Sequence, residues 1–302
     1  MRYGLTIDPS GPLPELTEQV RTIGEAGIAE VAISQIFGYD ALTVLAVIGQ
    51  QVPDVELVTA VVPTYPRHPL MLAAQALTVQ AATGGRLTLG IGLSHKLVIE
   101  GVFGLSFEQP VRHMREYLQV LMPLLHGERC SVQGETIQTN GQLGIDAPAP
   151  DVLVAALGPK MLELTGELAD GTMTWMTGPR TIETLTVPTI TAAASAAGRK
   201  PPRISVSLPV CVTADVAAAR ERADNNFAIY GQLPSYRAML DREGAAGPGD
   251  VAFAGDEEAV AAQIAGLAES GVTDFLAAPF GSRDEREQTV ALVAELSRSA
   301  GS

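Results

Sequence analysis

Short apolar runs alternate with longer amphipathic stretches along almost the whole chain. Most runs are rich in Val, Ile, Leu or Ala and stop close to a glycine, a proline or a polar residue. Runs of this kind, bounded by turn residues, predict buried β-strands. The expected strands are 3–7, 30–33, 56–62, 87–91, 152–156, 172–175, 203–212 and 273–277.

Between these strands the apolar residues recur at helical spacing, as Leu16, Val20 and Ile23 do. The expected helices are 14–26, 41–50, a stretch ending near 82, 111–126, one starting at 159, 181–197, 215–230, 232–242, 256–270 and 283–298. Eight strands alternating with helices are typical of an α/β fold of the (β/α)8 TIM-barrel type.

The length of 302 residues fits such a barrel, usually of ~250 residues, with additions. We assign the additions to 97–109, which is too long for a tight turn after the fourth strand, to a small hairpin at 131–137, and to extra helices at 215–242 after the seventh strand. No repeat or linker divides the chain. We therefore expect one domain over residues 1–302.

Composition narrows the range of partners. Hydrophobic residues make up 46% of the chain, and the net charge of −14 disfavours nucleic acid. No apolar run approaches the ~20 residues of a membrane span. The two cysteines, Cys130 and Cys211, lack metal-site spacing, so we expect neither a disulfide nor a metal. Met1 leads directly into a strand without a secretory leader pattern, so the expected location is the cytoplasm. The expected partner is a small molecule.

Candidate chemistry centres on 86–96, where the fourth strand ends in Gly90-Ile91-Gly92 and is followed by Ser94, His95 and Lys96. The glycines resemble part of a dinucleotide fingerprint, but His95 stands where that motif needs its last glycine, and the acidic residue expected further on is missing. In a TIM barrel, chemistry lies at the carboxyl ends of the strands. We therefore interpret this segment as polar groups delivered to the barrel mouth.

A second signal is the placement of the lysines. The chain has only three, Lys96, Lys160 and Lys200, and the first two follow predicted strand ends. Gly158 and Pro159 begin a helix there, so free N–H groups would face a ligand. The pattern predicts an anion or phosphate site, although Gly-Pro is also simply a good helix start.

The four histidines have different settings. His113 and His126 fall on a predicted outer helix, which favours solvated surface groups, and His68 sits at a helix start, where a polar cap is common. His95 ends the turn after the fourth strand. Because the pKa of histidine is close to neutral, His95 is the candidate for proton delivery.

In order and spacing, several short motifs resemble the bacterial luciferase-like flavin-dependent oxidoreductases, and among them the branch that uses the deazaflavin coenzyme F420. The motifs are Ile33-Ser-Gln-Ile-Phe37, Ala60-Val-Val-Pro63, Arg67-His-Pro69, Leu89-Gly-Ile-Gly-Leu-Ser-His95, Met114-Arg-Glu-Tyr117, Ala155-Ala-Leu-Gly-Pro159 and Ala169-Asp-Gly171. Together they span nearly the whole chain.

The resemblance implies a cofactor site. Family members hold a non-proline cis peptide behind the flavin ring, which corresponds here to Ala60-Val61, although an ordinary buried strand would explain the same residues. The cofactor phosphate rests against the loops after the fourth and fifth strands. The implied cofactor contacts are Ser34, Gln35, Ala60, Val61, Gly92, Ser94, His95, Ala156, Leu157, Gly158 and Lys160.

One departure from the family affects the expected reaction. Relatives that oxidise sugar phosphates carry an acid–histidine pair where this chain has Gln35-Ile36. Isoleucine cannot accept a proton from an alcohol, so we expect a reductase. Side chains near strand ends that would wall an apolar substrate pocket, with core packing as the alternative, are Phe37, Tyr39, Tyr65, His68, Phe103, Trp175 and Met176.

The resulting hypothesis is an F420-dependent oxidoreductase that transfers a hydride between the deazaflavin and a small, fairly apolar organic substrate. The alternatives are an FMN-dependent monooxygenase on the same barrel and a non-enzymatic flavin-binding barrel. Relatives often dimerise through early barrel helices, and the apolar stretch 41–48 is compatible with a homodimer.

Overall fold

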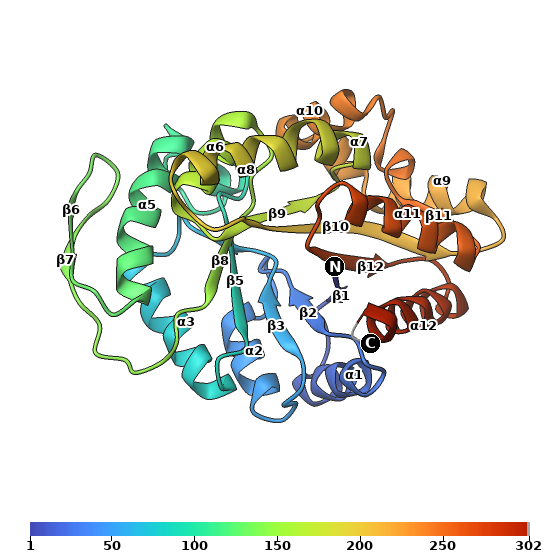
Figure 1. Cartoon of the computed structure of the whole chain (residues 1–302), viewed down its shortest axis with the longest axis horizontal. Coiled ribbons are helices and arrows are strands. Elements are labelled where there is room, and N and C mark those ends of the chain that lie inside the picture. Colours follow the sequence, from blue (N-terminus) through green and yellow to red (C-terminus); the bar gives the residue numbers. More distant parts are fainter. Residues whose placement is uncertain (301–302) are drawn as a thin grey trace.

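Eight parallel strands close into a barrel in the computed structural model, which describes residues 1–300. The strands are β1 (Arg2–Ile7), β2 (Glu30–Ile33), β3 (Glu56–Thr59), β5 (Leu87–Gly92), β8 (Asp151–Val154), β9 (Gly171–Trp175), β10 (Arg203–Val212) and β12 (Asp274–Pro279). Each strand pairs in parallel with its neighbours, and β12 pairs with β1 to close the ring (Figure 1). The predicted TIM barrel is confirmed.

Helices form the layer outside the strands. They are α1 (Leu13–Glu25), α2 (Ala41–Gly49), α3 (Pro69–Thr83), α5 (Pro110–Leu125), α6 (Pro159–Leu168), α8 (Val187–Ala196), α11 (Glu257–Glu269) and α12 (Arg283–Ala300). Local signals set their ends: the Asp40 side chain caps α2 by accepting from the Thr43 N–H, and α3 ends at Gly84 in the left-handed conformation. Within residues 1–300, every helix is too short or too polar to cross a membrane.

The additions to the barrel lie where the sequence predicts them. A short helix, α4 (Lys96–Gly101), begins the long connection after β5. The strands β6 (Cys130–Gln133) and β7 (Gln138–Gly141) form an antiparallel hairpin that lies outside the barrel in Figure 1. After β10 come α9 (Val216–Asn226), a 3₁₀ turn and α10 (Pro234–Glu243).

Several boundaries differ from the prediction. The expected third strand stops at Thr59, and after the Ala60–Val61 peptide a two-residue strand, β4 (Val62–Pro63), pairs with β5. The expected helix 181–197 is instead a short α7 (Pro179–Thr181), a π-helical turn and α8. Patterns of apolar residues cannot reveal such breaks, because both sides of the break remain equally apolar.

The loop 244–250 is partly buried. Its Gly249 N–H donates to the Asp224 carboxylate at 2.8 Å, and Pro248 is buried. The chain then enters β11 (Phe253–Gly255), which pairs in parallel with the last residues of β10. The sequence did not predict this strand. A strand of three residues is too short to show an alternating pattern.

Buried apolar side chains form three clusters, and two of them contain residues from several barrel strands. The larger cluster lies between the strands and the helices, whereas Ala32, Val58, Leu153, Met173 and Leu276 form a separate cluster. These five come from five different barrel strands. Since successive strand residues point to opposite faces, this smaller cluster fills the barrel interior.

The first residues of five barrel strands build a buried charge cluster at the amino end of the barrel. Arg203 lies 3.0 Å from Asp274 and 3.2 Å from Glu56, and Arg2 lies 3.0 Å from Glu30. Burial, together with the neighbouring carboxylates Asp274 and Glu56, raises the pKa of Glu30 to about 9. The Arg203 guanidinium, against the effect of burial, holds the pKa of Asp274 below its usual range. Glu30 is therefore a neutral acid next to an ionised one.

The strands β3 and β5 approach too closely for any side chain other than hydrogen at Gly90. A Cβ atom there would lie 1.9 Å from the Thr59 carbonyl oxygen, and one at Gly92 would lie 2.7 Å from the Val61 side chain. The Thr59 hydroxyl donates to the Gly90 carbonyl at 2.8 Å and holds the two segments together. Glycine at these positions is a packing requirement.

We expect Glu30→Gln to flatten the pH dependence of stability. Glu30 keeps its proton in the folded state up to about pH 9, whereas the unfolded chain releases it near 4.5, so wild-type stability falls as pH rises between these values. Asp274 titrates below this range. Urea unfolding at a series of pH values measures the slope, with Glu18→Gln as an exposed control. Parallel curves for wild type and Glu30→Gln would contradict the assignment.

Gly90→Ala should destabilise the protein by about 1–3 kcal/mol, because the added methyl group overlaps the Thr59 carbonyl. Gly158→Ala is the matched control: a Cβ there has no heavy atom within 4 Å, and its φ of −86° suits alanine. Urea unfolding of the two variants provides the measurement. An equal decrease in the free energy of unfolding in both variants would show that the contact with the Thr59 carbonyl is not the reason for glycine at position 90.

Candidate functional site

The carboxyl ends of β2, β3 and β5 meet in one continuous surface. The Ser34 hydroxyl donates to the Ala60 carbonyl at 2.8 Å, the Ala60–Val61 peptide is cis, and Val61 packs over Gly92. The Thr64 N–H then donates to the Gly92 carbonyl at 2.9 Å. The structure thus brings together four of the predicted cofactor contacts and confirms the expected cis peptide.

The next strand, β8, carries an open helix start to the same side of the barrel. Its continuation is tied to β5, since the Ala155 N–H donates to the Ile91 carbonyl at 2.8 Å. Gly158 then precedes α6, which begins without a side-chain cap, and the space above Gly158 is open. Lys160 lies exposed in the first turn of α6. In this turn Pro159 has no N–H and the Met161 N–H donates to the Gly158 carbonyl, so the N–H and the side chain of Lys160 are the groups that suit an anion.

Two of the predicted site residues have side chains that the structure buries. Ala156 and Met176 are both fully buried in the main core cluster. The chain turns inward at each position because an apolar side chain gains more from the core than from the rim. Leu157, also in the predicted set, is only partly buried and follows directly.

Backbone strain marks two strand ends at this mouth. Ser94, just after β5, and Met176, just after β9, are non-glycine residues with φ values of 60° and 53°. Such conformations are uncommon and often occur at functional sites. The turn at Ser94 leads directly into His95, the residue predicted to deliver a proton.

His95 is half-buried at the start of α4, and burial lowers the pKa of its imidazole. Its ring lies 5.7 Å from that of Tyr236 on α10, between centroids, with a tilt of 52°. The neighbouring Lys96 points to solvent and lies 3.8 Å from Glu100. At neutral pH the imidazole is therefore mostly uncharged and can donate or accept one proton.

Beyond His95, aromatic rings follow one another across the mouth. The centroid distances are 4.9 Å for Tyr236–Tyr230, 5.8 Å for Tyr230–Trp175, 5.6 Å for Trp175–Phe227 and 6.0 Å for Phe227–Phe280. We call these six residues, with His95 at one end, the ring chain. Of the six, only His95 and Trp175 were predicted from the sequence. Three aromatic residues within 227–236, in a chain with 5% aromatic residues, were the signal that would have found Phe227, Tyr230 and Tyr236.

His113 is buried, which corrects the expectation of a solvated group. Its ring stacks on Tyr65 at 3.9 Å, and its Nε2 lies 3.1 Å from the Thr64 hydroxyl. Burial lowers the pKa of His113 to about 4. The helix α5 turns this face onto the loop after β4, a packing that helical spacing alone does not show. The Tyr65 ring therefore packs against α5 and stabilises the loop after β4.

The loops after β2 and before α3 use their polar groups for capping. The Gln35 side-chain oxygen accepts from the Ala41 N–H at 2.7 Å, and the His68 Nδ1 accepts from the Leu70 N–H at 3.3 Å. Both are therefore helix caps, as the alternative interpretation of His68 predicted. The side chains left exposed by these loops and by the segment after α4 are Ile36, Phe37, Tyr39 and Phe103.

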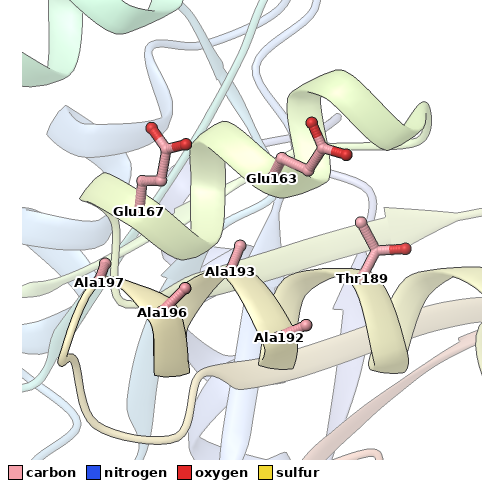
Figure 2. Close-up of a pocket in the computed structure, with 7 residues that line it drawn as sticks. All are labelled: Glu163, Glu167, Thr189, Ala192, Ala193, Ala196 and Ala197. Carbon is pink, nitrogen blue, oxygen red and sulfur yellow. The ribbon is translucent and has the colours of Figure 1, made fainter.

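A hollow of about 570 Å³ lies elsewhere, between α6 and α8 on the outer helical layer (Figure 2). It is lined by Glu163, Glu167, Thr189, Ala192, Ala193, Ala196 and Ala197. None of the candidate residues lines it, and its polar groups are two carboxylates and one hydroxyl. We therefore place the candidate site at the strand ends and not in this hollow.

Comparison with known proteins agrees with the barrel fold. Residues 2–297 match the family described as luciferase-like monooxygenase. A 5,10-methylenetetrahydromethanopterin reductase of Methanolobus tindarius is 27% identical over 247 residues, which cover 81% of this chain and 75% of the relative.

Two solved structures share the fold. A coenzyme F420-dependent tetrahydromethanopterin reductase from Methanopyrus kandleri has a TM-score of 0.81 at 22% identity, covering 97% of each chain. A monooxygenase from Streptomyces bottropensis has a TM-score of 0.76 at 20% identity, covering 100% of each. The family match over nearly the full length, supported by this fold, shows that the chain belongs to the luciferase-like monooxygenase family, a family of oxidoreductases.

Proposed function

We propose that this protein is an F420-dependent oxidoreductase that reduces a small, uncharged organic substrate. The observation that supports it most is the open helix start after β8: α6 has no side-chain cap, the space above Gly158 is open, and Lys160 lies in the first turn. Among the relatives, the Methanolobus tindarius protein is named a methylenetetrahydromethanopterin reductase, and the Methanopyrus kandleri structure is named as F420-dependent.

The residues present fit such a cofactor. Its phosphate would be held by the N–H and side chain of Lys160 and by the Ser94 hydroxyl, and its ring would rest on the surface made by Val61 and Gly92. When bound, a deazaflavin supplies a hydride carrier that reacts slowly with oxygen. The protein positions that carrier and shields the mouth from water.

His95 would hold the proton that the substrate gains. A half-buried, uncharged imidazole can donate one proton and be reprotonated from solvent, which suits a general acid. The opposite direction lacks a free base in the loop after β2: the Gln35 oxygen caps α2, Ile36 has no basic atom, and the Asp40 carboxylate is bound by the Thr43 N–H and by Arg67. This supports reduction over alcohol oxidation.

An FMN-dependent monooxygenase is the second candidate. The family description and the shared barrel of the Streptomyces bottropensis monooxygenase favour it. The same phosphate site would accept FMN, so the choice depends on the ring and the tail of the cofactor. A non-enzymatic flavin-binding barrel would bind either cofactor without turnover.

We also propose a homodimer formed through α2 and α3. These helices lie side by side and expose Val47 and Met71, which are 37% and 62% exposed. Exposed apolar side chains on adjacent helices favour burial against a second copy. A mass of one chain by sedimentation equilibrium would argue against this dimer.

Cofactor preference tests the proposal directly. We expect F420 to bind more tightly than FMN when each is titrated separately and followed by its own fluorescence. Lys160→Glu should weaken F420 binding by about tenfold or more, since it places a negative charge beside the phosphate. Lys200→Glu, a like charge change away from the anion site, is the control. Tight FMN binding without F420 binding would overturn the proposal, and equal F420 affinity in Lys160→Glu would reject the anion site.

The role of His95 is tested by turnover. With reduced F420 and a panel of enones and imines, His95→Ala should lower the rate of cofactor oxidation by about 10²–10⁴-fold while F420 affinity changes little. His126→Ala removes an exposed histidine and should leave the rate unchanged. An unaltered rate in His95→Ala would remove this residue from the mechanism.

A further inference from the structure

Tyr236 on α10 has a half-buried ring and a hydroxyl group without a protein partner. The ring packs between His95 and Tyr230, with centroid distances of 5.7 Å and 4.9 Å. Among residues 1–300 the Tyr236 hydroxyl makes no hydrogen bond, and it is not among the fully enclosed polar atoms. The hydroxyl of this half-buried phenol is therefore open to the surroundings and available to a ligand.

The position of α10 brings this hydroxyl to the candidate site. The helix lies beside α7, which follows the end of β9 and Trp175 (Figure 1). Tyr236 thus bridges the end of β5, through His95, and the end of β9, through Tyr230 and Trp175. A ligand touching Tyr236 at the mouth would also be within reach of the His95 imidazole.

The hydrogen-bonding groups here are uncharged. Burial raises the pKa of the Tyr236 phenol, so it remains a proton donor, and burial lowers that of His95. The ring contacts from His95 to Phe280 include no charged side chain. A carboxylate placed against these rings would lose its hydration without gaining a counter-charge.

We propose that Tyr236 binds the substrate, and that the substrate is an uncharged, planar, conjugated carbonyl compound. Its oxygen accepts a hydrogen bond from the Tyr236 hydroxyl beside His95, and its flat ring packs against Tyr230 and Trp175. Edge and face contacts between aromatic rings favour a planar ligand over a branched one. This assignment rests on the proposed function, since it places the substrate at the same mouth, and it narrows the substrate to one chemical class.

The chain contains a built-in reporter for this proposal. Trp175 is the only tryptophan, and its ring lies 5.8 Å from that of Tyr230. Its fluorescence can follow titrations of the full chain without any cofactor. Three probes share one bicyclic skeleton: 1-tetralone carries a conjugated carbonyl, tetralin has none, and 1-aminotetralin carries an ammonium group.

We expect 1-tetralone to change the Trp175 emission saturably and to bind more tightly than tetralin or 1-aminotetralin. Tyr236→Phe keeps the ring and removes the donor, so it should weaken 1-tetralone about 3- to 10-fold and leave tetralin unchanged, as for one neutral hydrogen bond. Tyr3→Phe makes the same change in β1, outside the ring chain, and should leave all three affinities unchanged.

Equal 1-tetralone affinity in wild type and Tyr236→Phe would overturn the proposal, as would tetralin or 1-aminotetralin binding at least as tightly as 1-tetralone. Thermal unfolding of Tyr236→Phe checks that the fold is intact. A separate F420 titration of the same variant should match wild type. Failure of F420 to bind either protein would overturn the proposed function, whereas the cofactor-free Trp175 titration decides the role of Tyr236 independently.

Discussion

The close approach of β3 and β5 is the constraint on which the candidate site depends. The Thr59 carbonyl occupies the place where a side chain at position 90 would be, and Val61 occupies the place at position 92. With no side chains between them, the chain leaves β3 early, passes through the Ala60–Val61 peptide and rejoins the sheet at β4. The Ser34 hydroxyl, bound to the Ala60 carbonyl, then joins β2 to the same surface.

The two ends of the barrel have opposite electrostatic character. The amino end concentrates buried charges, with Arg203 in contact with the carboxylates of Glu56 and Asp274. The carboxyl end carries the ring chain, whose polar groups are neutral, and exposed lysines at the starts of α4 and α6. This division matches the general rule that TIM barrels hold stability at one end and chemistry at the other. In the proposed function, the ring chain would bind the uncharged substrate and the start of α6 would bind the anionic tail of the cofactor, both at the same end of the barrel.

The additions after β5 and β10 give this barrel its particular mouth. His95 lies at the start of α4, and Tyr236 lies on α10, so the contact between their rings joins the two additions. His113 supports the opposite side by stacking on Tyr65 behind the β4 loop. The barrel strands are common to the family. The contacts between the segments that connect strands and helices shape the space available to a substrate.

Local pattern in the sequence determined the strand–helix alternation, the hairpin outside the barrel, the glycine pair of β5 and the helix start at Gly158. Each depends on residues close together in the chain, where periodicity, capping and turn preferences act directly. Only the tertiary structure decided that His113 is buried, that Met176 faces the core, and that Tyr236 lies against His95. These depend on contacts between residues far apart in sequence, such as 95 and 236, whose mutual orientation is set by how the connections pack over the barrel. No local pattern encodes that orientation.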